Sequence, residues 1–581
     1  MRVSKAQWPV LIIFLTYLLA TVPLLKVPLR WDETEWPPQA TAILKRAVPK
    51  VLFAESPFIY HPNAWLMRYG ADYGLWHPPL YLYCLAAFIG LLGKSIMAAR
   101  FFGQFSGLMT LGIVVFGVGH IAKKKGWPDS LANRAAFISG MIVAVNPFYV
   151  HGALLVDIDN TVLMFLIILY LFLFIFSKEF LTGRRIALLG LISLLLFWTK
   201  LTTPVIMMAT VAFYCILKRE WRLLFKLLGI TVFSAVIFVL SWLSYASIFK
   251  APASFFLDFT YLGKASQLFQ FNLYNMLSAA RFNIVMISFP LAALVGLLFI
   301  RRIISWTRTH FFLEMEDLFW LMAAALFLFY SFFWTIFGKY TVMLVPILAV
   351  PIGLNIAELL SRSDNKSSVC FWMGIGLAAF LYYWRIVPDI IVGPHRILSA
   401  SSFAMAMADP RILKYFLAAI PVFWAFCILY LRRHDFKATR FIAMYLLVIL
   451  FPANIVQNIT MFPACVQANI LTPSQVTGFM DTVRFANKIL LSSDKVLAPK
   501  EFAYYLKKGK VIPFGREIAY PEQFLPAIFL KDALAPKYAV FCVQPHGLLD
   551  TSGFYHRYQM IRKIGDFSVW KKIYLYSYMC L

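Results

Sequence analysis

The chain contains few acidic residues and little charge of any kind. Aspartate and glutamate account for 27 of its 581 residues, and all charged residues for 14%. Hydrophobic residues make up 61% of the chain, and apolar runs repeatedly reach the length of about 20 residues that a helix needs to cross a bilayer. This composition excludes a soluble protein and predicts a polytopic α-helical membrane protein.

The chain also lacks motifs that mark other protein classes. Its seven cysteines show no CxxC spacing, so no zinc site is predicted, and whether Cys465, Cys542 and Cys580 form a disulfide stays open. No nucleotide-binding loop occurs, which argues against energy from a soluble nucleotide. No internal repeat of the type found in many transporters is visible.

The positive charge of the chain indicates membrane topology and not a nucleic acid partner. The net charge is +27, but the basic residues cluster in short segments between apolar runs, for example at 123–125 and 301–302. This is the positive-inside pattern. The basic start of the chain places the N-terminus in the cytoplasm, and the first apolar run is predicted to be a retained span and not a cleaved signal peptide.

With the basic segments taken as cytoplasmic, the apolar runs predict about thirteen transmembrane helices. The expected spans are 8–28, 96–119, 135–149, 160–177, 186–200, 203–217, 227–247, 282–300, 318–337, 341–360, 369–386, 414–431 and 441–457. An odd number of crossings places the residues from about 458 onward on the outer side of the membrane, together with the loop after the first span.

The outer loop, residues 29–96, is expected to contain two juxtamembrane helices. The first, over 37–48, opens with two prolines. Its apolar face is formed by Ala40, Ile43, Leu44, Ala47 and Val48. The second helix covers 77–93 and is short for a span.

Two domains are predicted: a transmembrane module, residues 1–457, and a small extracytoplasmic α/β domain, residues 458–581. The strands expected in the second are 496–498, 510–513, 538–543 and 569–576, with a helical stretch at about 501–507 and turns at Gly515 and Gly565. About a hundred residues suffice for such a domain.

Carboxylates are crowded in the segment RWDETEW, directly after the first span. Asp32, Glu33 and Glu35 are bracketed by Trp31 and Trp36. A solvated acidic turn at the membrane surface is one interpretation. The aromatic flanks also fit a half-buried crevice, in which a carboxylate can act as a general base on a hydroxyl group.

A second acidic cluster, Asp157 and Asp159, lies in VDIDN before the span that begins near 160. Two carboxylates at this spacing can share a divalent cation or hold a polar substrate. Alternatively, one of them caps the following helix and the other is solvated. The predicted topology places both acidic clusters on the outer side.

Three cations occupy positions that cytoplasmic retention does not explain. Lys200 interrupts the apolar stretch 186–217 and is expected at the outer turn of a helical hairpin, paired with a carboxylate or a phosphate. Lys339 occupies a similar turn, and Arg100 lies near the outer end of its span. Snorkelling to the interface is the alternative for each.

His61 and His77 each precede a proline, and neither has metal-ligand spacing to a partner. A lone histidine is more often structural than a ligand, but both are candidates, with Trp31 and Trp36, for lining a substrate pocket. Two carboxylate clusters and several cations beside a lipid phase suit a reaction between a phosphate-bearing lipid and a hydroxyl. A carboxylate would accept the hydroxyl proton, and the cations would stabilise the departing phosphate.

Six segments together resemble the GT-C glycosyltransferases, in particular the group of protein O-mannosyltransferases and lipid A aminoarabinose transferases. They are the acidic pair DE, HPPLY, ARFFGQFSG, NPFYVHGALLVDIDN, the TK of the hairpin and KYTVMLVP, in this order over roughly the first 360 residues. The C-terminal third is similar only in architecture. The chain departs from the group in the residues after the DE pair and in having DID where one aspartate is usual.

The resemblance implies an inverting hexosyl- or pentosyltransferase that moves a sugar from a polyprenyl phosphate to a hydroxyl of a lipid, glycan or protein at the outer face. It also implies roles for single residues: Asp32 as catalytic base, Glu33 as its neighbour, Asp157 or Asp159 as the second acidic site, and Lys200 and Lys339 as donor-phosphate ligands. The position of Arg100 makes it a third candidate for binding the phosphate. No cofactor is assigned, and metal dependence stays open, since Asp157 and Asp159 can hold a divalent cation. A bacterial inner membrane is the expected location.

Two other functions fit the same residues. A transporter or flippase of a lipid-linked or anionic solute would use the carboxylates to couple ions within the membrane, whereas the acidic residues here border loops. A ligase or polymerase of lipid-linked glycans would share the outer-face chemistry but transfer a preassembled glycan.

Overall fold

A computed structural model describes about three-fifths of the chain in fifteen stretches. They are residues 8–27, 29, 33, 36–49, 77–177, 182–250, 289–308, 313–331, 338–361, 450–451, 454, 478–499, 502–514, 536–542 and 557–572. The chain divides into two compact units. The first comprises Met1–Leu25, Arg100–Ser241 and Phe259–Asn469, and the second Lys26–Ala99, Trp242–Asp258 and Ile470–Leu581. The predicted domain boundary at 457 stays a prediction.

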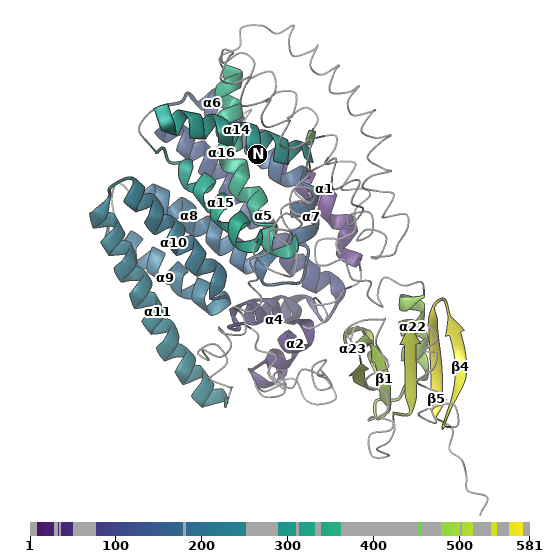
Figure 1. Ribbon diagram of the computed structural model, residues 1–581. Coiled ribbons are helices and arrows are strands. Elements are labelled where there is room, and N and C mark those ends of the chain that lie inside the picture. Colours follow the sequence, from purple (N-terminus) through teal and green to yellow (C-terminus); the bar gives the residue numbers. More distant parts are fainter. Residues whose placement is uncertain are drawn as a thin grey trace, which may run out of the picture. The chain divides into compact units, whose positions relative to one another are not determined.

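Helices alone form the described part of the first unit (Figure 1). Those that lie in it wholly or for most of their length are α1 (Trp8–Thr21), α5 (Ile96–Lys124), α6 (Asp129–Val145), α7 (Pro147–Ala153), α8 (Met164–Ser177), α9 (Gly183–Thr199), α10 (Thr202–Leu217), α11 (Trp221–Phe249), α14 (Phe289–Arg308), α15 (Asp317–Ser331) and α16 (Leu344–Ser361). Among the described residues, five helices are long and apolar enough to cross a membrane, or six if the bent pair α6 and α7 is one span. The protein is a multi-pass membrane protein, as predicted.

The number of thirteen crossings stays a prediction. The expected spans at 369–386 and 414–431 lie outside the described residues, as does most of 441–457. The span expected at 160–177 agrees to within one residue with the π-helical turn Asp159–Leu163 followed by α8, and the span expected at 203–217 agrees as closely with α10.

The span predicted at 135–149 is wrong at its end. Helix α6 stops at Val145, and α7 starts at Pro147 after a bend of 66°. The residue before a proline disfavours the helical backbone, so Asn146 is extended, with ψ at 120°, and its side chain accepts the Tyr149 N–H. Asn146 therefore ends one helix and caps the next.

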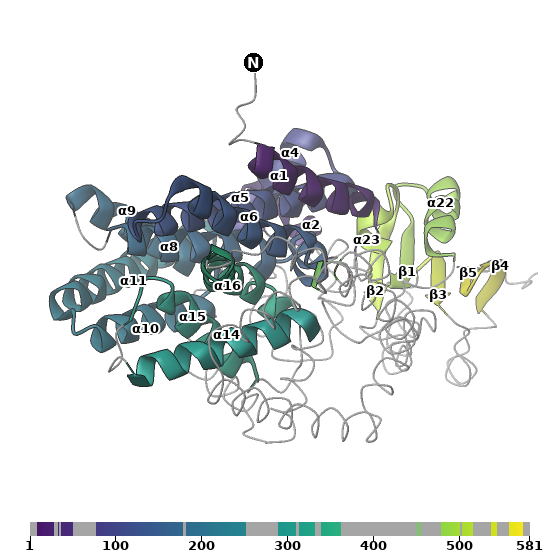
Figure 2. The same ribbon diagram turned by 90° about the horizontal axis from the view of Figure 1, so that it is seen from above.

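Helix α6 packs along α16 at the centre of the first unit, and it also packs on α1 (Figure 2). Gly353 of α16 lies so close to α6 that a Cβ atom there would meet Ser139 Oγ at 1.8 Å. Ser139 Oγ in turn donates to the Ala349 carbonyl at 2.8 Å. Close backbone approach through small residues, with a hydroxyl bridging the helices, is typical of packing in membranes.

In the second unit, α2 (Trp36–Arg46) packs on α4 (Leu80–Leu92), so both juxtamembrane segments are helical, as predicted. The first helix ends earlier than expected, because Ala47 adopts a left-handed φ of 62°. Ala40, Ile43 and Val48 of the predicted apolar face are buried, and Leu44, which is 50% exposed, lies against α4, where a Cβ atom at Gly90 would meet it at 3.1 Å.

The C-terminal part forms a five-stranded mixed sheet in the order β2-β1-β3-β5-β4. Its strands are β1 (Lys495–Pro499), β2 (Lys510–Phe514), β3 (Tyr538–Cys542), β4 (Tyr558–Ile564) and β5 (Phe567–Lys572), and its helices are α22 (Phe479–Ile489) and α23 (Phe502–Tyr505). The four predicted strands are present, but the predicted end of the last, 573–576, and the predicted turn at Gly515 lie outside the described residues. Strand β4 was not predicted. It is an edge strand whose middle is exposed and carries basic residues, which protect the edge from pairing with another chain. Its sequence therefore lacks the alternation of apolar and polar residues by which a strand is recognised.

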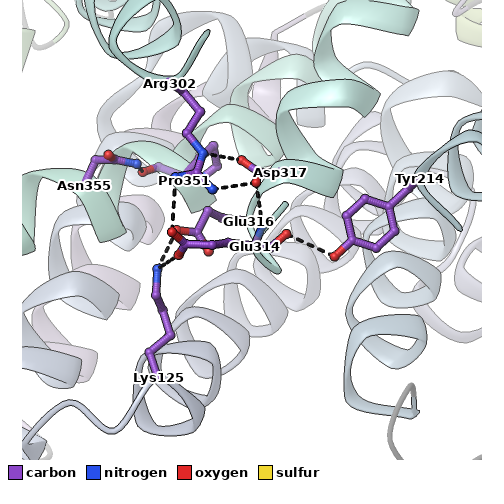
Figure 3. Close-up of polar contacts among 8 residues, drawn as sticks. All are labelled: Lys125, Tyr214, Arg302, Glu314, Glu316, Asp317, Pro351 and Asn355. Atoms are coloured by element: carbon purple, nitrogen blue, oxygen red, sulfur yellow. Dashed lines mark hydrogen bonds and ion pairs between the residues drawn. The ribbon is translucent and has the colours of Figure 1, made fainter. Parts of the chain in front are cut away.

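A charged cluster that the sequence analysis did not identify joins α5, α14 and α15 (Figure 3). The Lys125 ammonium group donates a hydrogen bond to Glu314, and its Nζ lies 2.5 Å from Glu316 Oε1. Arg302 donates two hydrogen bonds to Asp317, at 2.7 and 2.6 Å. Arg302 was expected in a loop after a span ending at 300, but α14 continues to Arg308 and carries Arg302 to its partner.

The pKa values of two glutamates in this cluster are shifted in opposite directions. Burial raises the pKa of Glu316 from its ordinary value of 4.5 to about 7. Burial also opposes ionisation of Glu314, but the hydrogen bond and charge of Lys125 outweigh it and lower the pKa of Glu314 to about 2. One ammonium group thus holds one carboxylate ionised while its neighbour keeps a proton near neutral pH.

Glu316→Gln is expected to change how stability depends on pH. With the pKa of Glu316 raised, the folded protein binds a proton that the unfolded chain releases, so this residue costs stability as pH rises from about 4.5 to about 7. The melting temperature of the variant in detergent, relative to wild type, should therefore rise between pH 5 and pH 7. Glu314→Gln is the comparison variant: its offset should rise less, since the charge of Glu314 is only one of the causes that raise the pKa of Glu316. If the melting temperatures of wild type and both variants changed in parallel with pH, the raised pKa of Glu316 would be contradicted.

Candidate functional site

Asp157 and Asp159 lie between α7 and α8, and each pairs with a lysine distant in sequence. Lys200 Nζ lies 2.5 Å from Asp159 Oδ1, and Lys339 Nζ lies 2.9 Å from Asp157 Oδ2. All four residues are buried, at no more than 5% exposed. The structure thus brings together the second acidic site and two of the three predicted phosphate-binding cations.

Local backbone structure fixes the two aspartates. Asp157 Oδ1 accepts the Asp159 N–H at 3.1 Å, and the Asp157 carbonyl accepts the Thr161 hydroxyl at 2.7 Å. Asp159 opens a π-helical turn, Asp159–Leu163, that leads into α8. Such turns are rare and frequent at functional sites. The alternative of a capping aspartate beside a solvated one is wrong: the N-cap residue of this turn is Ile158, without a side-chain cap, and both aspartates are buried and paired with lysines.

Both lysines lie at the starts of helices. Lys200 follows α9 and precedes α10, which confirms its predicted place at the turn of a helical hairpin, and its predicted pairing is with a carboxylate. Lys339 belongs to the 3-10 turn Gly338–Thr341 before α16. Snorkelling is wrong for both, because each ammonium group points into the bundle and pairs there.

Tyr340 lies between the lysines. The ammonium nitrogens of Lys200 and Lys339 are 4.5 and 5.4 Å from the centre of its ring. The ring stacks on Tyr330 with centroids 5.2 Å apart, and the Tyr330 hydroxyl lies 2.6 Å from Thr203 Oγ1. Cation–π attraction is stronger away from water, so this stack holds the two ammonium groups on one side of the cluster.

The four charges balance, which explains how they are tolerated inside the protein. A buried charge is costly unless it is paired and hydrogen-bonded, and here each carboxylate has an ammonium partner. The two ammonium groups can also change partners. A phosphate group that enters the cluster would compete with the two carboxylates for them.

Arg100 is fully buried and donates to the Leu154 carbonyl at 2.8 Å. This bond ties the start of α5 to the segment that precedes Asp157. It is a structural contact, and binding of a phosphate by Arg100 stays a prediction.

The second unit holds the other predicted residues that the structure describes. Glu33 is completely buried. Trp36 begins α2, is 6% exposed, and packs edge-on against Tyr81 with centroids 5.8 Å apart. His77 is half-buried just before α4. Asp32, Trp31 and His61 lie outside the described residues.

Sequence reasoning missed two residues, each close in sequence to a predicted site residue, that have unused hydrogen-bonding capacity. Asn160, beside Asp159, is completely buried, and within the described part of the chain neither atom of its amide has a hydrogen-bond partner. The same holds for Gln39 of α2, one helical turn from Trp36. Buried amides are almost always paired, so each is a candidate substrate contact. The only signal in the sequence was the N of VDIDN.

A divalent cation at Asp157 and Asp159 stays a prediction. No group of three or more histidine, cysteine, aspartate or glutamate side chains suited to a metal occurs among the described residues. The two carboxylates already accept ion pairs, so a cation bound between them would displace lysine.

The fold and this cluster define a polytopic helical membrane protein with a buried, charge-balanced polar site at helix starts. Residues 76–245 match a family model described as dolichyl-phosphate-mannose-protein mannosyltransferase. No curated protein matches the chain by sequence.

Solved structures with the same fold extend the comparison over nearly the whole chain. The crystal structure of ArnT from Cupriavidus metallidurans bound to undecaprenyl phosphate is 15% identical, with a TM-score of 0.61, covering 98% of this chain and 99% of that one. The apo structure of the same protein is 14% identical, with a TM-score of 0.58 and the same coverage. The predicted resemblance to the GT-C glycosyltransferases is confirmed by this family model and this fold.

Proposed function

We propose that the protein is a membrane glycosyltransferase that moves a sugar from a polyprenyl phosphate donor to an acceptor hydroxyl at the outer face of the membrane. The observation that carries the proposal is the buried pair Lys200 and Lys339, held by carboxylates and a shared tyrosine ring. The ArnT structure with this fold was crystallised with undecaprenyl phosphate, the class of lipid proposed here. The sugar is a hexose or pentose, the acceptor a lipid, glycan or protein, and the location a bacterial inner membrane.

The proposed reaction is a single displacement that inverts the sugar. The acceptor oxygen bonds to the anomeric carbon while the bond from that carbon to the phosphate oxygen breaks, and the bonding electrons leave with the polyprenyl phosphate. Asp32, with Glu33 beside it, takes the hydroxyl proton. Lys200, Lys339 and Arg100 balance the charge on the departing phosphate.

The sugar and acceptor would lie beside two described residues with free hydrogen-bonding capacity. The indole N–H of Trp36 and the amide of Gln39 are buried and have no partner among the described residues, which suits them to bind hydroxyl groups. Trp31, His61 and His77 complete the proposed pocket.

The test is reconstitution of the full chain in liposomes with defined polyprenyl phosphate sugars, followed by measurement of free polyprenyl phosphate. Release from at least one donor is expected, with Lys339→Met reducing the rate. Sugars and acceptors are then varied one at a time, and the anomeric configuration of the product reports inversion. Absence of release from every hexosyl and pentosyl donor would refute the proposal.

Asn160→Leu is expected to separate stability from activity. Replacing an unpaired buried amide by an apolar side chain is neutral or stabilising, so the melting temperature should hold or rise. If the amide binds the donor, transfer should fall about tenfold or more, in line with about 1.4 kcal/mol for a lost hydrogen bond. Unchanged transfer would remove Asn160 from the site. Thr161→Val, which loses a backbone bond only, is the comparison variant.

One observation favours the transporter alternative: the bent pair of α6 and α7, since broken helices form many transport sites. The break at Asn146 and Pro147 carries no charged side chain, however, and the carboxylates lie beyond α7. A transporter would move a lipid-linked substrate across the liposome membrane without releasing polyprenyl phosphate, so the same assay distinguishes the two.

A further inference from the structure

An open apolar pocket of about 590 Å³ lies on the first unit, away from the Asp–Lys cluster. It is lined by Phe14 of α1, by side chains of α5 between Leu108 and His120, and by side chains of α8 between Leu169 and Phe176. Met109 is 44% exposed and Phe116 65% exposed, so large apolar side chains face the open side. We refer to this pocket as the α5–α8 groove.

The groove occupies the half of the helices that is remote from the candidate site. Helix α5 starts beside the site, where Arg100 bonds the Leu154 carbonyl, and α8 starts just after Asp159. From Leu108 to His120 the groove runs about 18 Å along α5, at 1.5 Å per residue. That is close to half of a hydrocarbon core about 30 Å thick, so the groove fits the chain of a lipid in one leaflet.

Basic side chains surround the far end of the groove. His120 packs edge-on against Phe176, with ring centroids 4.4 Å apart. Arg185 donates to the Phe176 carbonyl at 3.2 Å. Lys123 and Lys124 follow His120 by three and four residues, on the same face of α5. Lys123 pairs with the exposed Asp129, an arrangement worth little in water.

We propose that the α5–α8 groove binds an acyl chain of an anionic phospholipid, with the headgroup phosphate held by Lys124, Arg185 and His120. The apolar lining of the groove suits an acyl chain, and the basic side chains at its far end favour a negatively charged headgroup. By the positive-inside rule this end faces the cytoplasm, where anionic headgroups lie beside it. The site is separate from the proposed donor site and does not depend on the proposed function.

Gly112 gives a way to fill the groove without disturbing the fold. A Cβ atom at Gly112 would lie 3.7 Å from Phe14, an ordinary contact, whereas at Gly117 it would lie 2.3 Å from the Phe172 ring. Gly112→Phe therefore places a ring in the groove. Gly229→Phe on α11 is the matched control, since nothing lies within 4 Å of that position.

The experiment is native mass spectrometry of the delipidated full chain, titrated with phosphatidylglycerol and phosphatidylcholine of identical acyl chains. Wild type should bind one phosphatidylglycerol about thirtyfold more tightly than phosphatidylcholine, from about 1 kcal/mol for each of the two contacts made by Lys124 and Arg185. Gly112→Phe should lose this tight site, and Lys124→Gln with Arg185→Gln should lower phosphatidylglycerol affinity to that of phosphatidylcholine. Gly229→Phe, and Arg222→Gln with Lys226→Gln on α11, should bind as wild type does.

Three results would overturn the proposal. Equal affinity of wild type for the two phospholipids would remove the role of the basic end. An unchanged tight site in Gly112→Phe would place the lipid elsewhere. Displacement of phosphatidylglycerol by a lower concentration of polyprenyl phosphate would assign the groove to that lipid. Because the readout is binding, each result is independent of transferase activity.

Discussion

Replacing Lys200 by methionine is expected to destabilise the protein by about 3–5 kcal/mol and to abolish most transfer. The variant leaves Asp159, which is 2% exposed, without its ion-pair partner, and an unpaired buried charge carries this cost. Transfer should fall about 10²–10³-fold if the ammonium group also stabilises the departing phosphate. Thermal unfolding in detergent measures the first effect, and release of polyprenyl phosphate the second.

The double variant Asp159→Asn with Lys200→Met separates the two effects. Removing both charges removes the unpaired carboxylate, so stability should recover by most of the loss seen in the single variant. Activity should stay low, because the cation is still missing. If activity returned together with stability, the pair would be purely structural. Lys123→Met is the control, since its exposed ion pair with Asp129 should contribute less than about 1 kcal/mol.

The pairing of Lys200 shows how far sequence reasoning reaches. An ammonium group in the middle of an apolar stretch must find an anionic partner, and this argument predicted the kind of partner at the turn of a hairpin. It did not predict that Lys339 would pair with Asp157, because residues 182 positions apart meet only through the packing of whole helices. The hydrophobic pattern located the helices, but it contains no information on which of their ends adjoin.

The overlooked cluster of Glu314, Glu316 and Asp317 had a visible signal. Three carboxylates within four residues is the same crowding that singled out RWDETEW. The basic residues that explain it, Lys125 and Arg302, looked like ordinary cytoplasmic anchors, because a charge rule records their side of the membrane and not their contacts. Some of the basic residues that give the positive-inside pattern therefore also belong to an ion-pair network that joins three helices.

Replacing Asp32 by asparagine is expected to reduce transfer by about 10²–10⁴-fold, the contribution of a positioned general base. Asparagine keeps the size and polarity of the side chain but cannot accept the acceptor's proton. Donor binding should be unchanged, since the base acts on the hydroxyl and not on the lipid phosphate. Single-turnover release of polyprenyl phosphate measures the chemical step, and binding of a non-reacting polyprenyl phosphate measures donor affinity.

Glu35→Gln is the matched control for Asp32→Asn, because it removes one negative charge from the same acidic segment three residues away. If the carboxylates of RWDETEW act only through their summed charge, both variants should lose activity to a similar extent. If Asp32 is the base, Glu35→Gln should stay within about twofold of wild type. Glu33 is completely buried and interacts with another group, which Glu33→Gln would leave without its partner, so this variant should give a third pattern, a lower melting temperature with partial activity. Transfer by Asp32→Asn at the wild-type rate would show that the proton goes elsewhere.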